Sequence, residues 1–560
     1  MSEGERPWSR VQRKAMFCDP QPGPKPLWSV LADSAARHPG SPCIYYNGAV
    51  LTYAEVDRLS SRFASALGTL GVKKGDRVAV FLPNTPQFVI AFFGILKAGG
   101  VVTACNPLYK ERELEHQLAD SGAGVVVAAR DVVDGSDLYQ SLAACRPRLG
   151  VKHVVTTSVA DYLPPLKRRL AGLAGVRAVK RPDTLDFQGL IRAHEADTAP
   201  TPVDPMADLA VLQYTGGTSG VSKGSMLTHF GVYSISLRAT SFLPLTEKDV
   251  FLAVLPLFHV YGLVASLMIP MQVGAQVLLL PRFHVEDVMK TVQERKATMI
   301  CAVPAMYAAI AGNPKAIRYD MSSVRICISG GASLPSSVRA GFMRVSGASL
   351  VEGYGLSETS ALTHLNPLYE GGAREGSVGV PFPGTDVAVV DPDNPARPLQ
   401  AGSVGEVAVQ GPQVMVGYWN NPEESRAALR DGWLLTGDLG RMDDDGYLYI
   451  VDRKKDMVNV GGFKVYPREL EELLCSHPAV REAGVVAKPD AFSGEAVKAF
   501  VVLKEHGRAV TAAELVAYCE KNVARHKVPK EVVFVPELPK TLLGKVLRRK
   551  LREPTFGLPS

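Results

Sequence analysis

Short apolar runs alternate with amphipathic stretches from about residue 28 onward, and this alternation limits the possible folds more than any other feature. Residues 53–70 carry alanine, leucine and phenylalanine at helical spacing, residues 76–82 (DRVAVFL) form an apolar run, and residues 87–97 return to helical spacing. Repeated strand–helix–strand order favours parallel sheets whose faces are covered by helices. We therefore predict an α/β fold with largely parallel sheets.

The chain has 560 residues, too many for one ordinary hydrophobic core, so we expect more than one domain. A turn signal at 443–447 (DDDGY) and a charged junction at 452–456 (DRKKD) separate the preceding sequence from a block with its own predicted strands and helices. We predict a large N-terminal domain over residues 1–452 and a small, mobile α+β domain over residues 453–560, hinged at about 452–456. The predicted elements of the small domain are helices at 467–476 and 511–522 and strands at 483–487 and 499–503.

The composition excludes several classes of protein. A net charge of +6 is too small for a protein that coats nucleic acid, and eight cysteines without a CxxC pair argue against a zinc site or a disulfide framework. The N-terminus lacks an apolar signal core, and the most apolar stretch, 88–105, contains Lys97 and a Gly-Gly pair, which argues against a membrane span. We expect a cytoplasmic protein without a nucleic-acid partner, either a monomer or a homodimer.

One region has an unusual charge pattern. Residues 162–182 contain six basic residues and no acidic one, interleaved with leucine and valine. Such a segment is consistent with a solvated surface helix and its loop. It is also consistent with peripheral contact to an anionic membrane, and both interpretations stay open.

The strongest chemical signal is the segment 214–224 (YTGGTSGVSKG), which follows an apolar run and precedes a stretch that we predict to be helical. Glycines let backbone N–H groups approach an anion, hydroxyls donate to phosphate oxygens and a lysine supplies positive charge. The segment fits neither GxxxxGK[ST] nor GxGxxG. We predict a phosphate-binding loop whose contacts come from Thr215, Gly216, Gly217, Thr218, Ser219, Gly220 and Lys223.

This loop resembles the phosphate loop of the adenylate-forming superfamily, which contains acyl-CoA synthetases, nonribosomal adenylation domains and beetle luciferases. Ser219 stands where the family pattern has threonine and Ser222 where it has proline, and both changes keep the loop small and polar. The resemblance implies that the protein binds ATP with Mg²⁺.

Three further motifs of the large domain match the family in order. Residues 255–262 (LPLFHVYG) resemble the motif whose histidine, here His259, borders the acyl-binding tunnel. Residues 329–335 resemble the loop beside adenine, and residues 352–359 (EGYGLSET) resemble the motif whose tyrosine stacks on adenine and whose glutamate holds magnesium. The implied nucleotide contacts are Gly331, Ala332, Ser333, Glu352, Gly353, Tyr354, Gly355 and Ser357, with Glu358 and Thr215 as the metal ligands.

The last motifs lie at the predicted junction and in the small domain. By resemblance, Asp438 (in WLLTGD) and Arg453 contact the ribose, Lys455 is the hinge, and Gly461 and Gly462 line the channel of the coenzyme A thiol. Lys545, in PKTLLGK, matches the lysine that bridges the substrate carboxylate and the α-phosphate. The implied catalytic residues are Lys545, Glu358, His259 and Lys455.

Together the motifs imply an acid–thiol ligase that forms an acyl-adenylate and transfers the acyl group to coenzyme A. Residues 106–118 resemble the branch of long- and medium-chain fatty acyl-CoA synthetases, and residues 260–271 (VYGLVASLMIPM) are apolar enough to line a tunnel or to form an ordinary buried helix. A 4-coumarate-like aromatic acid and an acceptor other than coenzyme A remain alternatives. A luciferase-like oxygenase would carry the same motifs, whereas a nonribosomal adenylation domain is expected to precede a carrier domain.

Overall fold

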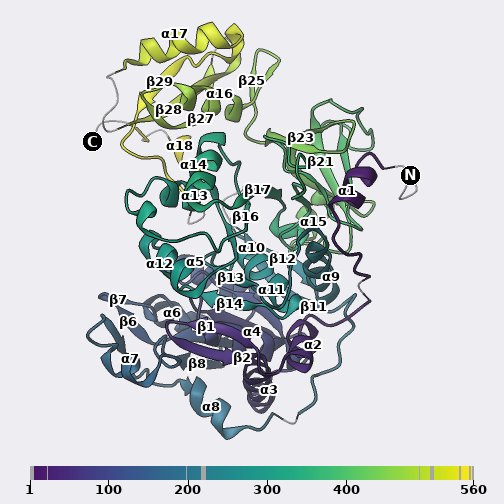
Figure 1. The fold of residues 1–560 in the computed structure, drawn as a ribbon. Coiled ribbons are helices and arrows are strands. Elements are labelled where there is room, and N and C mark those ends of the chain that lie inside the picture. The colour runs from purple at the N-terminus through teal and green to yellow at the C-terminus, as the bar shows by residue number, and fades with distance from the viewer. Residues whose placement is uncertain are drawn as a thin grey trace.

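The computed structural model describes residues 6–21, 23–196, 198–215, 222–490, 492–504, 510–541, 544–553 and 556–557. Two large sheets form the body of the N-terminal part (Figure 1). In the nine-stranded sheet, six neighbouring strands are parallel, and antiparallel strands close both edges. Its order is β19 (Val380–Pro381), β18 (His364–Leu365), β17 (Ser349–Tyr354), β16 (Ile326–Ser329), β15 (Met299–Ala302), β13 (Val250–Ala253), β14 (Gln276–Leu279), β1 (Pro42–Tyr46) and β2 (Ala49–Thr52).

The seven-stranded sheet is parallel apart from the last pair of strands, which is antiparallel. The strand order is β10 (Leu185–Asp186), β8 (His153–Thr157), β5 (Val125–Ala129), β3 (Arg77–Phe81), β4 (Val101–Ala104), β11 (Leu209–Thr215) and β12 (Lys223–Thr228).

Helices cover both sheets, and α4 (Pro86–Lys97) is buried along its whole length. The ammonium of Lys97 lies 2.7 Å from Asp57 and donates to the hydroxyls of Ser60 and Ser61 on α3, so a charged residue fits inside this apolar helix. The other helices here are α1 (Ser9–Ala15), α2 (Ser29–Arg37), α3 (Tyr53–Thr69), α5 (Glu111–Ser121), α6 (Gln140–Cys145), α7 (Pro165–Leu170), α8 (Phe187–Ala193), α9 (His229–Ala239), α10 (Val260–Leu263), α11 (Ile269–Val273), α12 (Val285–Arg295), α13 (Pro304–Ala311), α14 (Ser336–Ser346) and α15 (Pro422–Ala428).

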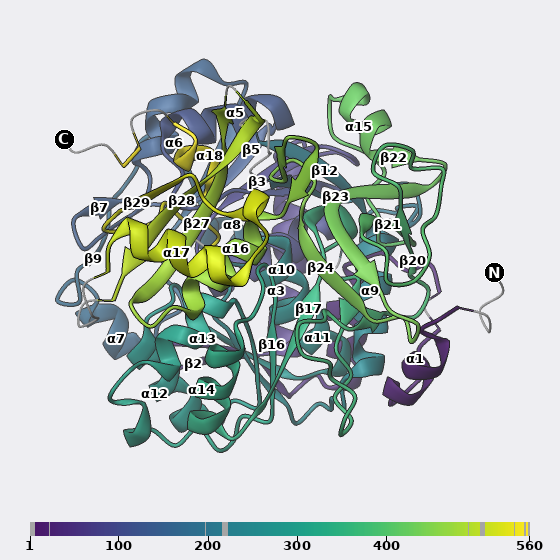
Figure 2. The ribbon, with the colours of Figure 1, turned by 90° about the horizontal axis from the view of Figure 1, so that it is seen from above.

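A third, antiparallel sheet follows the two large ones. It contains β20 (Asp386–Val390), β21 (Gly405–Gln410), β22 (Leu429–Arg430), β23 (Trp433–Met442) and β24 (Leu448–Arg453). Seen from above, it lies beside the C-terminal part of the chain (Figure 2). The C-terminal part therefore starts at the end of β24, where Arg453 pairs with Asp438 in the middle of β23.

The C-terminal part has its own sheet and its own hydrophobic core. The strands are β25 (Val458–Val460), β26 (Phe463–Val465), β27 (Val480–Asp490), β28 (Gly494–Leu503) and β29 (Glu531–Phe534), and the helices are α16 (Pro467–Ser476), α17 (Ala512–Asn522) and α18 (Arg548–Leu551). The predicted hinge at 452–456 covers the last two residues of β24 and the turn that leads to β25. The division into a large domain over residues 1–452 and a small mobile domain over residues 453–560 stays a prediction.

The predicted α/β class is confirmed, and the predicted helices at 53–70, 87–97, 467–476 and 511–522 correspond to α3, α4, α16 and α17. The helical stretch expected after the phosphate loop is α9, but it does not follow the loop directly. The chain instead returns as β12, because residues 223–228 pair with β11 and only then enter α9. Within the described part of the chain, no helix is both long and apolar enough to cross a membrane.

Candidate functional site

The predicted phosphate loop connects β11 and β12. Thr215 pairs with Lys223 at the loop end of this hairpin. The Ser222 hydroxyl donates to the Thr215 carbonyl at 2.6 Å. The five predicted contacts of the loop itself lie outside the described residues: Gly216, Gly217, Thr218, Ser219 and Gly220. The strands on either side therefore fix the two ends of the loop, with Thr215 and Lys223 opposite each other.

Glu358 lies next to this hairpin, on the 3₁₀ turn η6 (Ser357–Thr359). One of its carboxylate oxygens accepts from the Tyr418 hydroxyl at 2.9 Å. The Lys223 ammonium lies 5.4 Å from the centre of the Tyr418 ring and 2.8 Å from Glu424. Tyr418 thus connects the predicted metal ligand to the predicted phosphate-binding lysine.

The donor set around Glu358 fits magnesium held mainly by substrate. Among the described residues, no group of three or more His, Cys, Asp or Glu side chains is placed to hold a metal ion. Glu358 and Thr215 offer one carboxylate and one hydroxyl. Mg²⁺ in nucleotide sites uses one or two protein carboxylates, phosphate oxygens and water, so this sparse set is chemically compatible.

The predicted ribose contacts meet where two sheets approach each other. Asp438 on β23 lies opposite Arg453 on β24, and the Arg453 Nε lies 3.3 Å from one Asp438 oxygen. The other oxygen accepts from the Tyr354 hydroxyl at 2.7 Å. Burial and the nearby Asp438 raise the pKa of Tyr354, so the phenol stays protonated and donates. Three residues from distant parts of the sequence form one polar group.

The predicted adenine loops follow β16 and the neighbouring strand β17, which pair in parallel. Gly331 and Ala332 are exposed, and a side-chain carbon at Gly330 would lie 3.0 Å from the Tyr261 ring, so backbone and ring are in close contact. Glu352 accepts from the Leu334 N–H at 3.3 Å, and burial raises its pKa to about 7. This geometry makes Glu352 a residue that positions the loop carrying Ser333.

An apolar pocket opens beside these loops, with a cavity volume of about 70 Å³. On one side it is lined by His259, Val260, Tyr261, Ala265 and Ile269, which come from α10, the π-helical turn η4 (Val264–Met268) and the start of α11. The opposite wall contains Gly331, Gly353, Tyr354, Gly355, Ser357, Leu362, His364 and Phe382. One face of the segment 260–271 therefore lines a pocket while the remainder packs in the core.

His259 is neutral in this environment. Burial lowers its pKa to about 4, and its Nδ1 accepts from the Tyr261 N–H at 3.3 Å, which leaves the proton on Nε2. A neutral imidazole at the pocket can orient a polar substrate group without adding charge.

Lys545 lies close enough to Arg453 and Asp438 for their charges to act on its ammonium. The Thr541 N–H donates to the Lys545 carbonyl at 2.8 Å, which forms a tight turn, and Leu542 and Leu543 inside it lie outside the described residues. A side-chain carbon at Gly544 would lie 2.9 Å from Cβ of Ala305, so the turn rests on the start of α13 in the N-terminal part. Burial and the charge of Arg453 lower the pKa of Lys545 to about 8.

The predicted hinge is surrounded by ion pairs. Before the hinge, Asp452 accepts from the Arg468 N–H at 2.8 Å and from the Arg548 guanidinium at 3.0 Å. After the hinge, Asp456 accepts from Arg548 and from Arg552. Lys455 itself is exposed. The contacts of Asp452 join residues on opposite sides of Lys455, as does the hydrogen bond from the Arg468 guanidinium to the Ile450 carbonyl at 2.7 Å.

Gly461 and Gly462 are not brought to the site. They form the exposed tip of the β25–β26 hairpin with positive φ angles of 58° and 90°, and a side-chain carbon at Gly462 would meet nothing within 4 Å. The structure therefore unites Lys545 with Asp438, Arg453 and Tyr354 and leaves the Gly-Gly hairpin at the surface.

Sequence reasoning missed Tyr418 and the pairs that hold the hinge. Tyr418 lies in no phosphate or metal motif, and its role depends on a segment that runs beside β12, where the Trp419 N–H donates to the Gly224 carbonyl at 2.8 Å. Such a contact joins residues almost two hundred positions apart. No local pattern in this sequence could have indicated it.

Comparison with known proteins gives consistent matches. A family model described as AMP-binding enzyme matches residues 31–419, and one described as AMP-binding enzyme C-terminal domain matches residues 469–545. A long-chain-fatty-acid–CoA ligase of Bacillus subtilis is 42% identical over 94% of both chains. A 4-coumarate–CoA ligase of Vanilla planifolia is 34% identical over 94% of this chain and 93% of its own.

Among solved structures, ATP-bound MatB from Rhodopseudomonas palustris is 30% identical and superposes with a TM-score of 0.83, covering 94% of this chain and 98% of its own. Apo MatB, with the same identity and coverage, gives a TM-score of 0.73. The arrangement of this chain is therefore more similar to that of the ATP-bound form.

Proposed function

The chain belongs to the AMP-binding enzyme family, and on this premise we propose that it is an ATP-dependent acyl-CoA synthetase acting on medium- or long-chain fatty acids. The reaction converts a carboxylic acid, ATP and coenzyme A to acyl-CoA, AMP and pyrophosphate, with an acyl-adenylate as the intermediate.

One residue carries this proposal, because Tyr354 belongs to both halves of the site. Its ring lines the apolar pocket, and its hydroxyl donates to Asp438 in the ribose group. A nucleotide whose sugar binds Asp438 and an acid whose chain occupies the pocket would meet at this tyrosine. Lys545 lies at the same place.

The first step brings together two anions, so charge neutralisation is the main requirement. Lys545 is a cation held at the ribose group, and Lys223 lies at the end of the phosphate loop. Glu358 and Thr215 would hold Mg²⁺, which neutralises phosphate charge when bound. The acid carboxylate attacks the α-phosphorus, and pyrophosphate leaves with the bonding electron pair.

The second step needs no nucleophile from the protein, because the coenzyme A thiol attacks the acyl carbon and AMP leaves. Gly461 and Gly462 line the thiol channel in this proposal, yet they lie at the surface in the present arrangement. The C-terminal part therefore turns about Lys455 between the two steps. The higher TM-score to ATP-bound MatB favours the present arrangement as the one for adenylation.

The apolar pocket suits the hydrocarbon chain of a fatty acid. The walls formed by Val260, Ala265, Ile269, Leu362 and Phe382 offer aliphatic and aromatic carbon, and His259 is neutral. The similarity to the Bacillus subtilis ligase supports this choice. The similarity to the Vanilla planifolia ligase makes 4-coumarate the competing substrate.

An acid series tests the proposal. Each additional methylene buried in the pocket contributes about 0.8 kcal/mol, so kcat/KM should rise roughly fourfold per carbon of chain length until the pocket is full. Acyl-CoA and AMP are measured for saturated acids of increasing length and for 4-coumarate, with and without coenzyme A. A flat dependence on length together with faster turnover of 4-coumarate would move the assignment to an aromatic acid.

A further inference from the structure

The helix α7 (Pro165–Leu170) and the turn after it carry leucines on the solvent side. Leu166 is 69% exposed, Leu170 is 47% exposed and Leu173 is 87% exposed. At about 100° per residue, Leu166 and Leu170 fall on one face of the helix, and Leu173 lies in the turn that follows. The apolar face of a surface helix normally packs against the protein, and here it points away from it.

The opposite side of α7 carries polar contacts to the protein. The Lys167 ammonium donates to the Asn47 carbonyl at 3.0 Å, and the Arg168 guanidinium lies 3.6 Å from Asp161. Ala171 is buried on the same side. The helix is therefore attached by charged residues and a small one, while its leucines stay outside. This inverted arrangement leaves the apolar face of α7 free to contact a partner.

Three of the six cations in residues 162–182 have no polar partner within the described part of the chain. They are Arg169, Arg177 and Lys180, and all three are exposed. Around the helix axis, the direction of Arg169 differs from that of Leu166 by about 60°. Arg181 is different, because its guanidinium is paired with Asp137 and lies over the Tyr139 ring. The basic residues of this segment thus fall into two groups, those whose side chains contact the protein and those whose side chains have no polar partner among the described residues.

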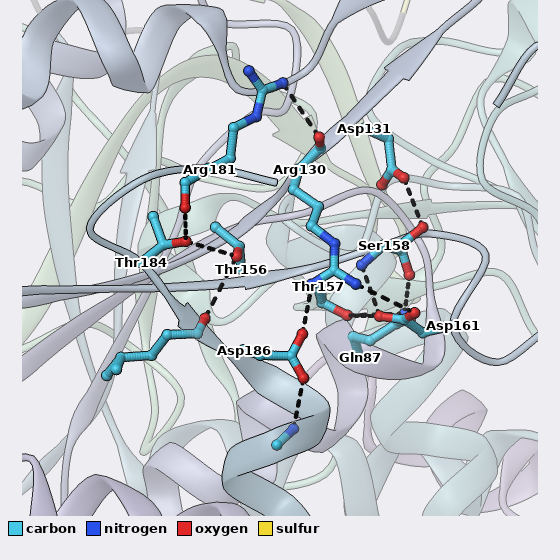
Figure 3. A network of polar contacts seen from close by, with 12 residues as sticks. Gln87, Arg130, Asp131, Thr156, Thr157, Ser158, Asp161, Arg181, Thr184 and Asp186 are labelled. Carbon is cyan, nitrogen blue, oxygen red and sulfur yellow. Dashed lines mark hydrogen bonds and ion pairs between the residues drawn. The ribbon is translucent and has the colours of Figure 1, made fainter. Parts of the chain in front are cut away.

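A network of polar contacts holds both ends of this segment (Figure 3). Before α7, Asp161 accepts from the Thr157 hydroxyl at 2.9 Å and from the Ser158 N–H at 2.8 Å, at the end of β8. After it, Arg130 pairs with Asp186 at 2.6 Å and its carbonyl accepts from Arg181. Between them, β9 (Val176–Ala178) pairs with β6 (Asp131–Val133). The leucines are presented by a firmly attached element.

We propose that the α7 surface, defined as Leu166, Arg169, Leu170, Leu173, Arg177 and Lys180, docks the protein on an anionic lipid bilayer. Exposed leucines enter the boundary between headgroups and acyl chains, and unpaired cations attract the anionic headgroups. No acidic residue occurs between 162 and 182 to oppose this attraction. The advantage for catalysis, that long-chain acids are taken up where they partition, rests on the proposed function.

Vesicle co-sedimentation tests the surface without ATP, coenzyme A or catalysis. The probes are vesicles of phosphatidylcholine alone and of phosphatidylcholine mixed with phosphatidylglycerol, at low and high salt. We expect binding to the mixed vesicles that weakens with salt. The triple variant Arg169→Gln/Arg177→Gln/Lys180→Gln should lower the partition coefficient roughly 100-fold, and Leu166→Ser/Leu173→Ser should lower it at least about tenfold.

The matched controls change the same charge and the same kind of side chain elsewhere. Arg10→Gln/Lys290→Gln/Arg397→Gln removes three exposed cations, and Ile317→Ser removes a side chain that is 91% exposed. Both should bind vesicles like the unchanged protein. All variants should retain acyl-CoA formation from acid supplied in solution, which separates failure of the surface from failure of the proposed function.

Equal loss in the control variants would overturn the assignment of the surface, because any exposed charge would then serve. Equal binding to neutral vesicles would overturn the role of the cations. Absence of binding to either vesicle would overturn the lipid assignment and leave an acidic protein as the partner.

Discussion

Lys545→Ala should abolish acyl-adenylate formation and leave thioester formation from supplied acyl-adenylate nearly unchanged. The reason is the position of the ammonium beside Arg453 and Asp438, where the acid and the α-phosphate would meet. Removing one group that stabilises charge in a transition state costs roughly 10²- to 10³-fold in rate. Rapid-quench measurement of each half-reaction gives the two rates separately.

Lys540→Ala is the matched control. Lys540 precedes the same turn, but its ammonium pairs with Glu482 on the C-terminal sheet and not with a residue of the site. Its loss should change adenylation less than about threefold, as expected for a surface ion pair. Equal loss of both half-reactions in Lys545→Ala would refute the assignment of this lysine to the first step.

The pH dependence follows from the same lysine. Burial and Arg453 lower the pKa of Lys545 to about 8, so the charged form is lost as the pH rises through this value. Adenylation kcat/KM, which reports the free protein, should therefore fall above about pH 8. Bound ATP adds negative charge and should shift the corresponding fall of kcat to higher pH.

Lys455→Pro should permit adenylation and block the thioester step. In the present arrangement the Lys455 N–H donates no hydrogen bond within the described part of the chain, so proline removes none. Rotation about this residue is what the second step requires, and proline fixes φ. We expect adenylation within about threefold of the unchanged protein and a roughly 100-fold slower thioester step.

The ion pairs around the hinge explain why the Lys455→Pro variant should keep the present arrangement of the C-terminal part. Turning about Lys455 must break the contacts of Asp452 with Arg468 and Arg548, whereas those of Asp456 lie wholly on the C-terminal side. Lys455→Ala is the control, because it keeps rotation free and should preserve both steps. A proline variant that loses adenylation but retains thioester formation would contradict the assignment of the present arrangement to the first step.

The sequence predicted the order of helices and strands because their periodicities are local. It predicted α16 at 467–476, where a proline stands at the first helical position and an apolar stripe follows. It did not predict β12, because glycine and small polar residues around Lys223 resemble the start of a helix as much as a hairpin. Pairing with β11 decides the outcome, and this pairing depends on the rest of the sheet.

The candidate site was predictable where a motif carries the whole interaction and unpredictable where two distant segments share it. Tyr354, Asp438 and Lys545 were named from motifs, yet only the fold shows that the first two are hydrogen-bonded. Tyr418 was missed for the same reason. The outward leucines of α7 were also unpredictable, because helical periodicity gives a face but not the side on which the protein lies.

Exchange of labelled pyrophosphate into ATP, measured without coenzyme A, tests the acyl-adenylate most directly. The account predicts exchange that requires a fatty acid and magnesium, and equal amounts of AMP and acyl-CoA once coenzyme A is added. Exchange that proceeds without any acid, or release of ADP and phosphate in place of AMP and pyrophosphate, would contradict it.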